Sequence, residues 1–169
     1  MPFSLNPMTD TKEAKKLNIA NSLLLKEVAT MIAEGHTVTL PLKGASMRPF
    51  LDGERDKAVL AKPREKAMEG DVVLAETSPG FYVLHRIVGV SGDRITLRGD
   101  GNLQAEHCSL GDIKAMATAF YRKGRQTPDE ISGLKWRLYS WLWTTLFPIR
   151  RYLLFINRKL FTQQDRQII

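Results

Sequence analysis

The chain has 169 residues, of which 43% are hydrophobic, and it carries a formal net charge of +7. This length and apolar content suffice for one domain with a buried core, which excludes global disorder. The charge is uneven, because residues 1–120 hold 15 basic and 15 acidic side chains whereas residues 121–169 hold 10 basic and 3 acidic ones. The sequence therefore joins an electrically balanced body to a cationic tail.

The sequence holds few indications of the cellular compartment of this protein. The single cysteine, Cys108, cannot form an internal disulfide, so the fold does not require an oxidising compartment. Residues 1–17 mix lysines with Asp10, which is unlike a cleaved leader. The longest uncharged stretch, residues 138–149, is shorter than the roughly 20 residues that a membrane-spanning helix needs. We expect a cytoplasmic protein, at most peripheral at a membrane.

The first expected element is an amphipathic helix over residues 11–34. Its apolar residues recur at helical spacing on one side: Leu17, Ala20, Leu24, Val28 and Met31. Gly35 ends the run. Residues 1–35 are thus expected to form an N-terminal helical segment.

Residues 36–124 are expected to form a mostly antiparallel β-sheet domain. Short apolar runs alternate there with Gly, Pro and Asp, as strands alternate with turns. The runs are residues 37–42, 57–62, 71–76, 81–90, 94–98 and 113–121.

A C-terminal helical segment, rich in aromatic and basic residues, is expected over residues 125–169. Thr127, Pro128 and Glu130 are typical of a capped helix start. Pro148 is expected to divide the segment into residues 133–147 and 149–161.

The segment 43–49, Lys-Gly-Ala-Ser-Met-Arg-Pro, is a candidate nucleophile turn. A serine becomes a good nucleophile only when a base holds its hydroxyl and an open turn exposes it. Gly44 and Ala45 would let a substrate backbone come close, with the N–H of Ser46 facing a developing oxyanion. Serine beside glycine is also common in ordinary turns, so this motif alone is weak evidence.

His85 lies in the expected strand 81–90. Strand alternation places it on the face of Val83 and Ile87 and sends Arg86 to the other face. A histidine among apolar neighbours tends to stay neutral, as a general base for serine must be. The competing interpretation is a core histidine bonded to a backbone carbonyl.

Asp100 lies in the glycine-flanked turn 98–102, Arg-Gly-Asp-Gly-Asn. This turn follows a strand that should pair with the strand of His85, so the carboxylate could orient the imidazole through its other nitrogen. An ordinary Asp-Gly turn is the alternative.

Four ordered boxes of this sequence resemble the signal peptidase and LexA-type serine peptidases, a mostly β superfamily with one catalytic domain. The boxes are 44–51 (Gly-Ala-Ser-Met-Arg-Pro-Phe-Leu), 70–73 (Gly-Asp-Val-Val), 85–93 (His-Arg-Ile-Val-Gly-Val-Ser-Gly-Asp) and 99–102 (Gly-Asp-Gly-Asn). The resemblance spans residues 37–121, half of the chain. It implies a signal-peptidase-like catalytic sheet that needs no metal or cofactor.

Carried over, the resemblance makes Ser46 the nucleophile and backbone oxyanion donor, His85 the base and Asp100 the acid. A histidine base is similar to the archaeal and endoplasmic-reticulum type, whereas most bacterial signal peptidases and LexA-type repressors have lysine. Asp112 is a second candidate for the acid; Asp100 is preferred because its box lies closer to the histidine. Small residues before the cut, in a leader or signal-like segment, are also implied.

Two departures from the family pattern limit this comparison. The family commonly has serine, an oxyanion donor, where Gly44 stands, so stabilisation would depend more on backbone N–H groups. The N-terminal membrane anchor of signal peptidases is replaced by the polar helix of residues 11–34, and no helix-turn-helix of a LexA-type repressor precedes the sheet.

Residues 128–161 interleave aromatic with basic side chains, and two interpretations remain open. The segment could lie in an anionic membrane surface, or it could cover the sheet or a partner with its charges in water. Nucleic acid is not expected as a partner, because exposed strand aromatics at stacking spacing are lacking. His107 and Cys108 lack the second ligand pair of a zinc site.

The sequence thus predicts a serine endopeptidase that cuts an extended peptide laid against a strand edge near Ser46. One alternative is a peptide-binding module of the same fold with weak or no catalysis. The other is a membrane-surface scaffold that acts through residues 128–161.

Overall fold

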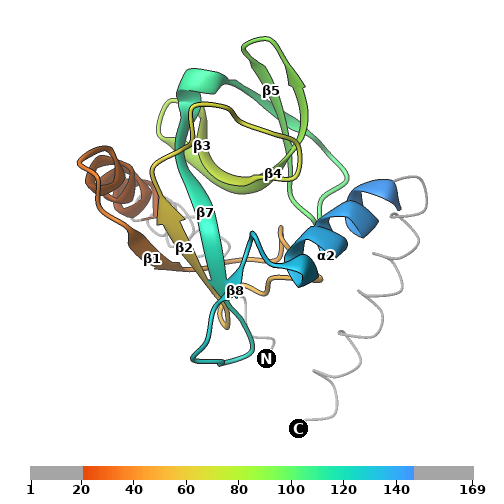
Figure 1. Cartoon of the computed structure of the whole chain (residues 1–169). Coiled ribbons are helices and arrows are strands. Elements are labelled where there is room, and N and C mark those ends of the chain that lie inside the picture. Colours follow the sequence, from red (N-terminus) through yellow and green to blue (C-terminus); the bar gives the residue numbers. More distant parts are fainter. Residues whose placement is uncertain (1–20, 147–169) are drawn as a thin grey trace, which may run out of the picture.

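The computed structural model describes residues 21–146 (Figure 1). A helix, described over residues 21–33, comes first, and the sheet strands follow in chain order. These are β1 (Val38–Pro41), β2 (Lys57–Ala61), β3 (Val72–Ser78), β4 (Phe81–Ser91), β5 (Arg94–Arg98), β6 (Glu106–Ser109), β7 (Ile113–Tyr121) and β8 (Asp129–Glu130). A 3-10 turn, η1 (Leu110–Asp112), precedes β7, and helix α2 (Leu134–Thr145) follows β8.

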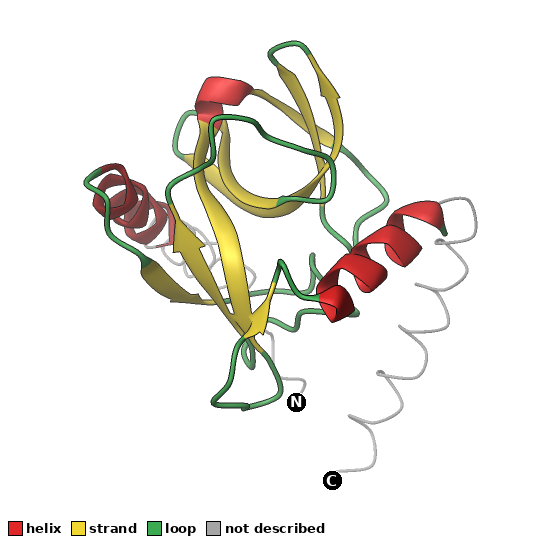
Figure 2. Ribbon diagram, in the orientation of Figure 1, coloured by secondary structure: helices red, strands yellow, loops and turns green. Residues whose placement is uncertain are grey.

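The strands form one antiparallel sheet in the order β1-β2-β7-β3-β4-β5-β6, with β8 paired to β7. Register shifts interrupt the pairing of β2 with β7, of β3 with β4 and β7, and of β4 with β5. Such bulges bend a sheet, and Figure 2 shows β4 strongly curved. The expectation of a mostly antiparallel β fold with two flanking helices is confirmed.

Every strand expected from the sequence is present, with ends that differ by a few residues. The expected helix start at Thr127–Glu130 is wrong, because Asp129 pairs with Phe120 as part of β8 and α2 begins only at Leu134. An ion pair of 2.6 Å between Arg122 and Asp129 favours the strand over a helix cap. Residues 11–20 and 149–161, also expected to be helical, lie outside the described residues.

Two apolar clusters make up the core. The larger includes Leu60 and Phe120 of the sheet, Val28 and Ile32 of the N-terminal helix, and Trp136 of α2. The smaller is formed by sheet residues: Val73, Ile87, Ile95, Leu97 and Met116 among others. Both helices therefore pack into the same core as the sheet, across the boundaries at residues 35 and 124 that the sequence suggested.

The N-terminal helix buries a face rotated from the expected one. Val28 and Ile32 are buried, whereas Leu24 and Met31 are 48% and 38% exposed. Leu25 is partly buried against the core, so the stripe of Leu25, Val28 and Ile32 faces inward at helical spacing. Leu24 instead borders a groove described below.

Candidate active site

Ser46 lies in a loop that leaves β1 and returns to β2. Backbone hydrogen bonds close this loop, from Glu54 N to Leu42 O at 2.9 Å and from Gly53 N to Gly44 O at 3.1 Å. A Cβ atom at Gly53 would collide with the backbone of Gly44, so the two arms of the loop can meet only because Gly53 has no side chain. The loop presents Ser46, half buried, at its tip.

The turn after β5 holds this loop from the other side. The N–H of Gly101 donates to the carbonyl of Ser46 at 2.7 Å. A Cβ atom at Gly101 would lie 2.6 Å from the carbonyl oxygen of Ala45, and one at Gly99 would overlap the carbonyl of Ser46. Glycine is therefore required at both positions for the two segments to touch. This contact brings together two of the boxes found in the sequence.

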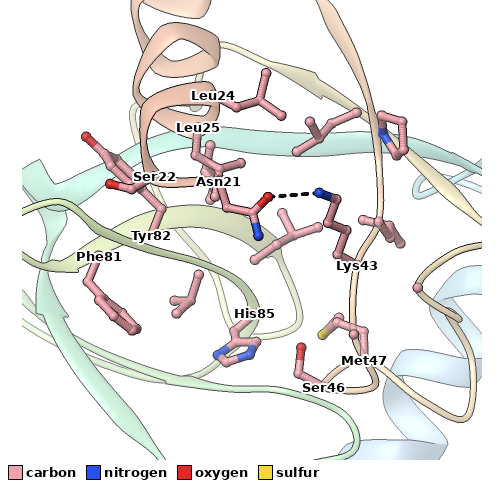
Figure 3. A pocket seen from close by; sticks show the side chains of 18 of the residues that line it. Asn21, Ser22, Leu24, Leu25, Lys43, Ser46, Met47, Phe81, Tyr82 and His85 are labelled. Carbon is pink, nitrogen blue, oxygen red and sulfur yellow. Dashed lines mark hydrogen bonds between the residues drawn. The ribbon is translucent and has the colours of Figure 1, made fainter. Parts of the chain in front are cut away.

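His85 is the buried neighbour of Ser46. It is 5% exposed in β4, and Figure 3 shows its ring beside the Ser46 hydroxyl at one end of a groove. Its Nδ1 lies 2.7 Å from Oε2 of Glu106. The other ring nitrogen, Nε2, lies near Gly99, the glycine that also contacts the carbonyl of Ser46. If Glu106 accepts the Nδ1 proton, Nε2 carries the lone pair.

The hydroxyl of Ser46 has no hydrogen bond to His85 among those described for residues 21–146. Catalytic hydrogen bonds are often long in empty sites and tighten when substrate binds. The geometry thus supplies a nucleophile, an adjacent imidazole and a carboxylate behind it, in the order that serine hydrolases use.

The prediction that Asp100 orients His85 is wrong, because the carboxylate on Nδ1 is that of Glu106. Asp100 instead binds Arg86, whose Nε and Nη2 donate to its two oxygens at 2.9 and 2.7 Å. The physical reason is strand alternation: His85 and Arg86 leave β4 on opposite faces, and the Asp100 side chain follows Arg86.

The second candidate acid, Asp112, is also remote from this role. Its carboxylate accepts from the backbone N–H of Ser109 and, at 2.7 Å, from the Ser109 hydroxyl, as the cap of η1. These two hydrogen bonds lower the pKa of Asp112.

Glu106 was missed because its strand was missed. β6 reads Glu-His-Cys-Ser, which lacks the apolar alternation that marked the other strands. It nonetheless pairs with β5, with Glu106 opposite Leu97. The available sequence signal for this strand was Cys108, two residues after Glu106. Cys108 packs against the smaller core cluster, and strand periodicity places Glu106 on the same face.

A buried polar network lies behind the candidate nucleophile turn. Arg86 is 1% exposed, and its Nη1 donates to Gly70 O at 2.9 Å and to Ser140 Oγ at 2.7 Å. From α2, Tyr139 donates to the Asp100 carboxylate and Trp143 to its backbone carbonyl, each at 3.2 Å. Burial alone would lower the pKa of Arg86, but the Asp100 carboxylate outweighs it and raises the pKa. Arg86 is therefore a permanent cation that fixes the Asp100 turn.

The oxyanion expectation rests on the backbone of Ser46. Its carbonyl accepts from Gly101, whereas among residues 21–146 no backbone hydrogen bond from its N–H is found. Gly44 has φ of +73°, a left-handed conformation that side chains disfavour. The position that lacks the serine hydroxyl therefore also has a backbone conformation that favours glycine.

The groove beside Ser46 and His85 has a volume of about 820 Å³. It runs between β1 and the first half of β4, with the N-terminal helix along it (Figure 3). β1 is an edge strand paired only with β2, and residues 81–85 of β4 pair with β3 while the pairing with β5 begins at Arg86. Two strand edges that have no strand partner among residues 21–146 therefore border the groove.

Other reactive groups fit the site less well. Burial, with lesser effects of Asp112 and Asp93, raises the pKa of the Cys108 thiol to about 11, so thiolate is scarce at neutral pH. Among residues 21–146 no group of three or more His, Cys, Asp or Glu side chains is placed to hold a metal ion. The Thr96 hydroxyl also has an imidazole beside it, that of His107 at 3.3 Å, but this pair is exposed and lies outside the groove.

Comparisons of this chain with models of known protein families, with curated proteins and with solved structures give no significant match.

Proposed function

We propose that this chain is a serine endopeptidase with Ser46 as nucleophile, His85 as general base and Glu106 as the carboxylate that orients the base. The observation that carries the proposal is the placement of His85, with Nδ1 2.7 Å from Glu106 and its ring beside Ser46.

In the first half of the proposed reaction, the Ser46 hydroxyl attacks the substrate carbonyl carbon and its proton passes to Nε2 of His85. The carbonyl oxygen becomes an oxyanion, which the N–H of Ser46 can stabilise. Glu106 stabilises the imidazolium that forms. The tetrahedral intermediate collapses to an acyl-enzyme, and Nε2 returns the proton to the leaving amine.

In the second half, water replaces the amine. Nε2 takes a proton from the water as its oxygen attacks the acyl carbon. Collapse of the second tetrahedral intermediate releases the new carboxyl end, and the proton goes back to the Ser46 oxygen. The second half thus consumes one water molecule, and the proton returns to where it began.

The substrate in this proposal is an extended peptide. The two strand edges that border the groove, β1 and residues 81–85 of β4, offer backbone donors and acceptors to a strand laid between them. Such pairing would bring a scissile carbonyl to Ser46 with few demands on side chains. A leader or signal-like segment of a precursor fits this mode of binding.

The test is labelling and cleavage by the full chain. We expect a fluorophosphonate to label the parent protein at Ser46 and to leave Ser46→Ala and His85→Ala unlabelled, because only an activated serine reacts. Peptide cleavage read by mass spectrometry should be lost in the same two variants. Folded parent protein that neither labels nor cleaves would contradict the proposal and favour the peptide-binding module.

We also propose that the outer face of α2 contacts an anionic membrane surface. Four large apolar side chains are exposed on this short helix: Leu134 at 83%, Leu138 at 64%, Trp141 at 62% and Leu142 at 45%. They follow helical spacing, opposite to Trp136 and Trp143, which are buried. The excess of basic residues after position 120 is complementary to anionic headgroups.

No helix within residues 21–146 is long and apolar enough to cross a membrane. Co-sedimentation with vesicles that contain phosphatidylserine tests the proposed contact of α2. We expect Leu138→Glu and Trp141→Glu to weaken binding, and Glu65→Gln, at an exposed site of the sheet domain, to leave it unchanged. Equal binding by all variants would exclude this face of α2.

A further inference from the structure

We infer that the N-terminal helix is a specificity element of the proposed peptidase, which selects substrates with large apolar side chains close to the scissile bond. The inference rests on the proposed function and concerns the same groove. Three consecutive helix residues, Leu23, Leu24 and Leu25, line that groove together with the catalytic pair.

The helix is fixed to both rims of the groove. On one rim, the Ser22 hydroxyl donates to the carbonyl of Gly80, in the turn between β3 and β4, at 2.5 Å. On the other rim lies Lys43, three residues before Ser46. Its Nζ donates to Oδ1 of Asn21 at 2.9 Å (Figure 3). Val28 and Ile32 anchor the following turns in the core. The helix is therefore a built wall of the site.

The lining of the groove defines the ligand chemistry. Leucines of the helix face Leu40 and Leu42 from β1 and its loop, and Phe81 and Val83 from β4. None of the described lining residues is acidic, and Lys43 and His85 are the basic ones. Transfer of an apolar side chain into such a surface is favourable, whereas a basic side chain would lose its hydration without an acidic partner among the described lining residues.

The size of the groove also favours large side chains. About 820 Å³ lies in the range of roughly 300 to 1,000 Å³ that holds most of a drug-sized ligand. Several side chains of a peptide can enter it at once. Small residues at the cut itself, as the family resemblance implies, are compatible with leucine or phenylalanine a few positions away.

Leu24 is suited to the test because it is 48% exposed and its replacement should not unfold the protein. The test compares kcat/KM for pairs of peptides that differ at one position within five residues of the cut. One peptide of each pair has Leu or Phe at this position, and the other has Ala. We expect the parent to prefer the large residue by about tenfold or more, the effect of a few carbon atoms in an apolar pocket. Leu24→Asp should reduce this preference to below about twofold, because the large apolar side chain then meets a carboxylate in place of leucine.

The matched control is Met31→Asp, on the same helix but outside the groove and 38% exposed. It should keep the parental preference. Equal cleavage of both peptides by the parent, or an unchanged preference in Leu24→Asp, overturns the inference while fluorophosphonate labelling of Ser46 upholds the peptidase. Absence of both labelling and cleavage in folded parent protein overturns the peptidase and the inference together.

Discussion

His85 and Arg86 are consecutive residues of β4 whose side chains bind two different carboxylates on opposite faces of the strand. His85 contacts Glu106 at 2.7 Å, and Arg86 holds both oxygens of Asp100. One residue of the pair lines the groove and the other lies in the buried network behind it. The two carboxylates are thus expected to have separable roles, in catalysis and in stability.

Glu106→Gln should lower kcat/KM by about 100-fold or more, because the amide cannot stabilise the imidazolium and can favour the wrong tautomer. Glu106 is partly exposed, with 38% of its side chain accessible, so the melting temperature should change little. Peptide cleavage and thermal unfolding measured on the same preparation check both expectations. Full activity in this variant would remove Glu106 from the proposed triad.

Asp100→Asn should act mainly on stability. It leaves the Arg86 cation buried without its counter-charge, and breaking a buried pair in this way costs about 3 to 5 kcal/mol. Denaturant unfolding measures the loss. The matched control is Asp93→Asn, at an exposed turn, where we expect less than about 0.5 kcal/mol. A stable Asp100→Asn variant without activity would instead give Asp100 a direct catalytic role.

Gly99 and Gly101 should tolerate no side chain. Gly101→Ala places a methyl group 2.6 Å from the carbonyl oxygen of Ala45, so the nucleophile loop must shift. A displacement of about 1 Å can reduce the rate about 100-fold. The control is Gly111→Ala, whose new Cβ meets Ser109 Oγ at an ordinary 3.9 Å. The two variants are compared by the rate of fluorophosphonate labelling, and equal rates would contradict the expected close contact.

Most of the strands, and the candidate residues Ser46 and His85, could be picked out from the sequence for a common reason. Apolar runs separated by turn residues specify strands locally, and Ser46 and His85 lie in short motifs with recognisable neighbours. The partner of His85 could not be found this way, because it depends on pairing between β5 and β6, a contact that leaves little trace in polar residues such as Glu106 and His107.

The error at Thr127–Pro128 has a different cause. The capping residues there are locally favourable for a helix, but Asp129 gains a strand partner in β7 and ion pairs with Arg122 and Lys135. Tertiary contacts thus outweigh a local propensity worth about 1 kcal/mol. Such competition cannot be weighed before the fold is known.

Asp56 should make stability fall in acid. Burial alone would raise the pKa of Asp56, but hydrogen bonds from Arg55 and from the N–H groups of Asp52 and Lys123 hold it below its ordinary value. A carboxyl with a lowered folded pKa contributes stability above its unfolded pKa of about 3.9 and loses it as the pH falls through the folded value.

Asp56→Asn should therefore lower the free energy of unfolding by about 2 kcal/mol at pH 7, with a smaller difference from the parent below about pH 4. Denaturant unfolding at pH 7, 5 and 3 measures the difference, and Glu65→Gln, at an exposed site, is the control. A difference that stays constant over this range would show that the charge of Asp56 is not what stabilises the fold.

The attachment of α2 to the Asp100 turn also has a consequence for biosynthesis. Tyr139, Ser140 and Trp143 complete the polar network that holds this turn, and all three come after every strand that the structure describes. A nascent chain that has released β7 but not α2 has both Ser46 and His85, yet lacks the support behind them. The proposed peptidase activity would therefore arise late in translation, when the unfinished chain has little opportunity to cut itself or its neighbours.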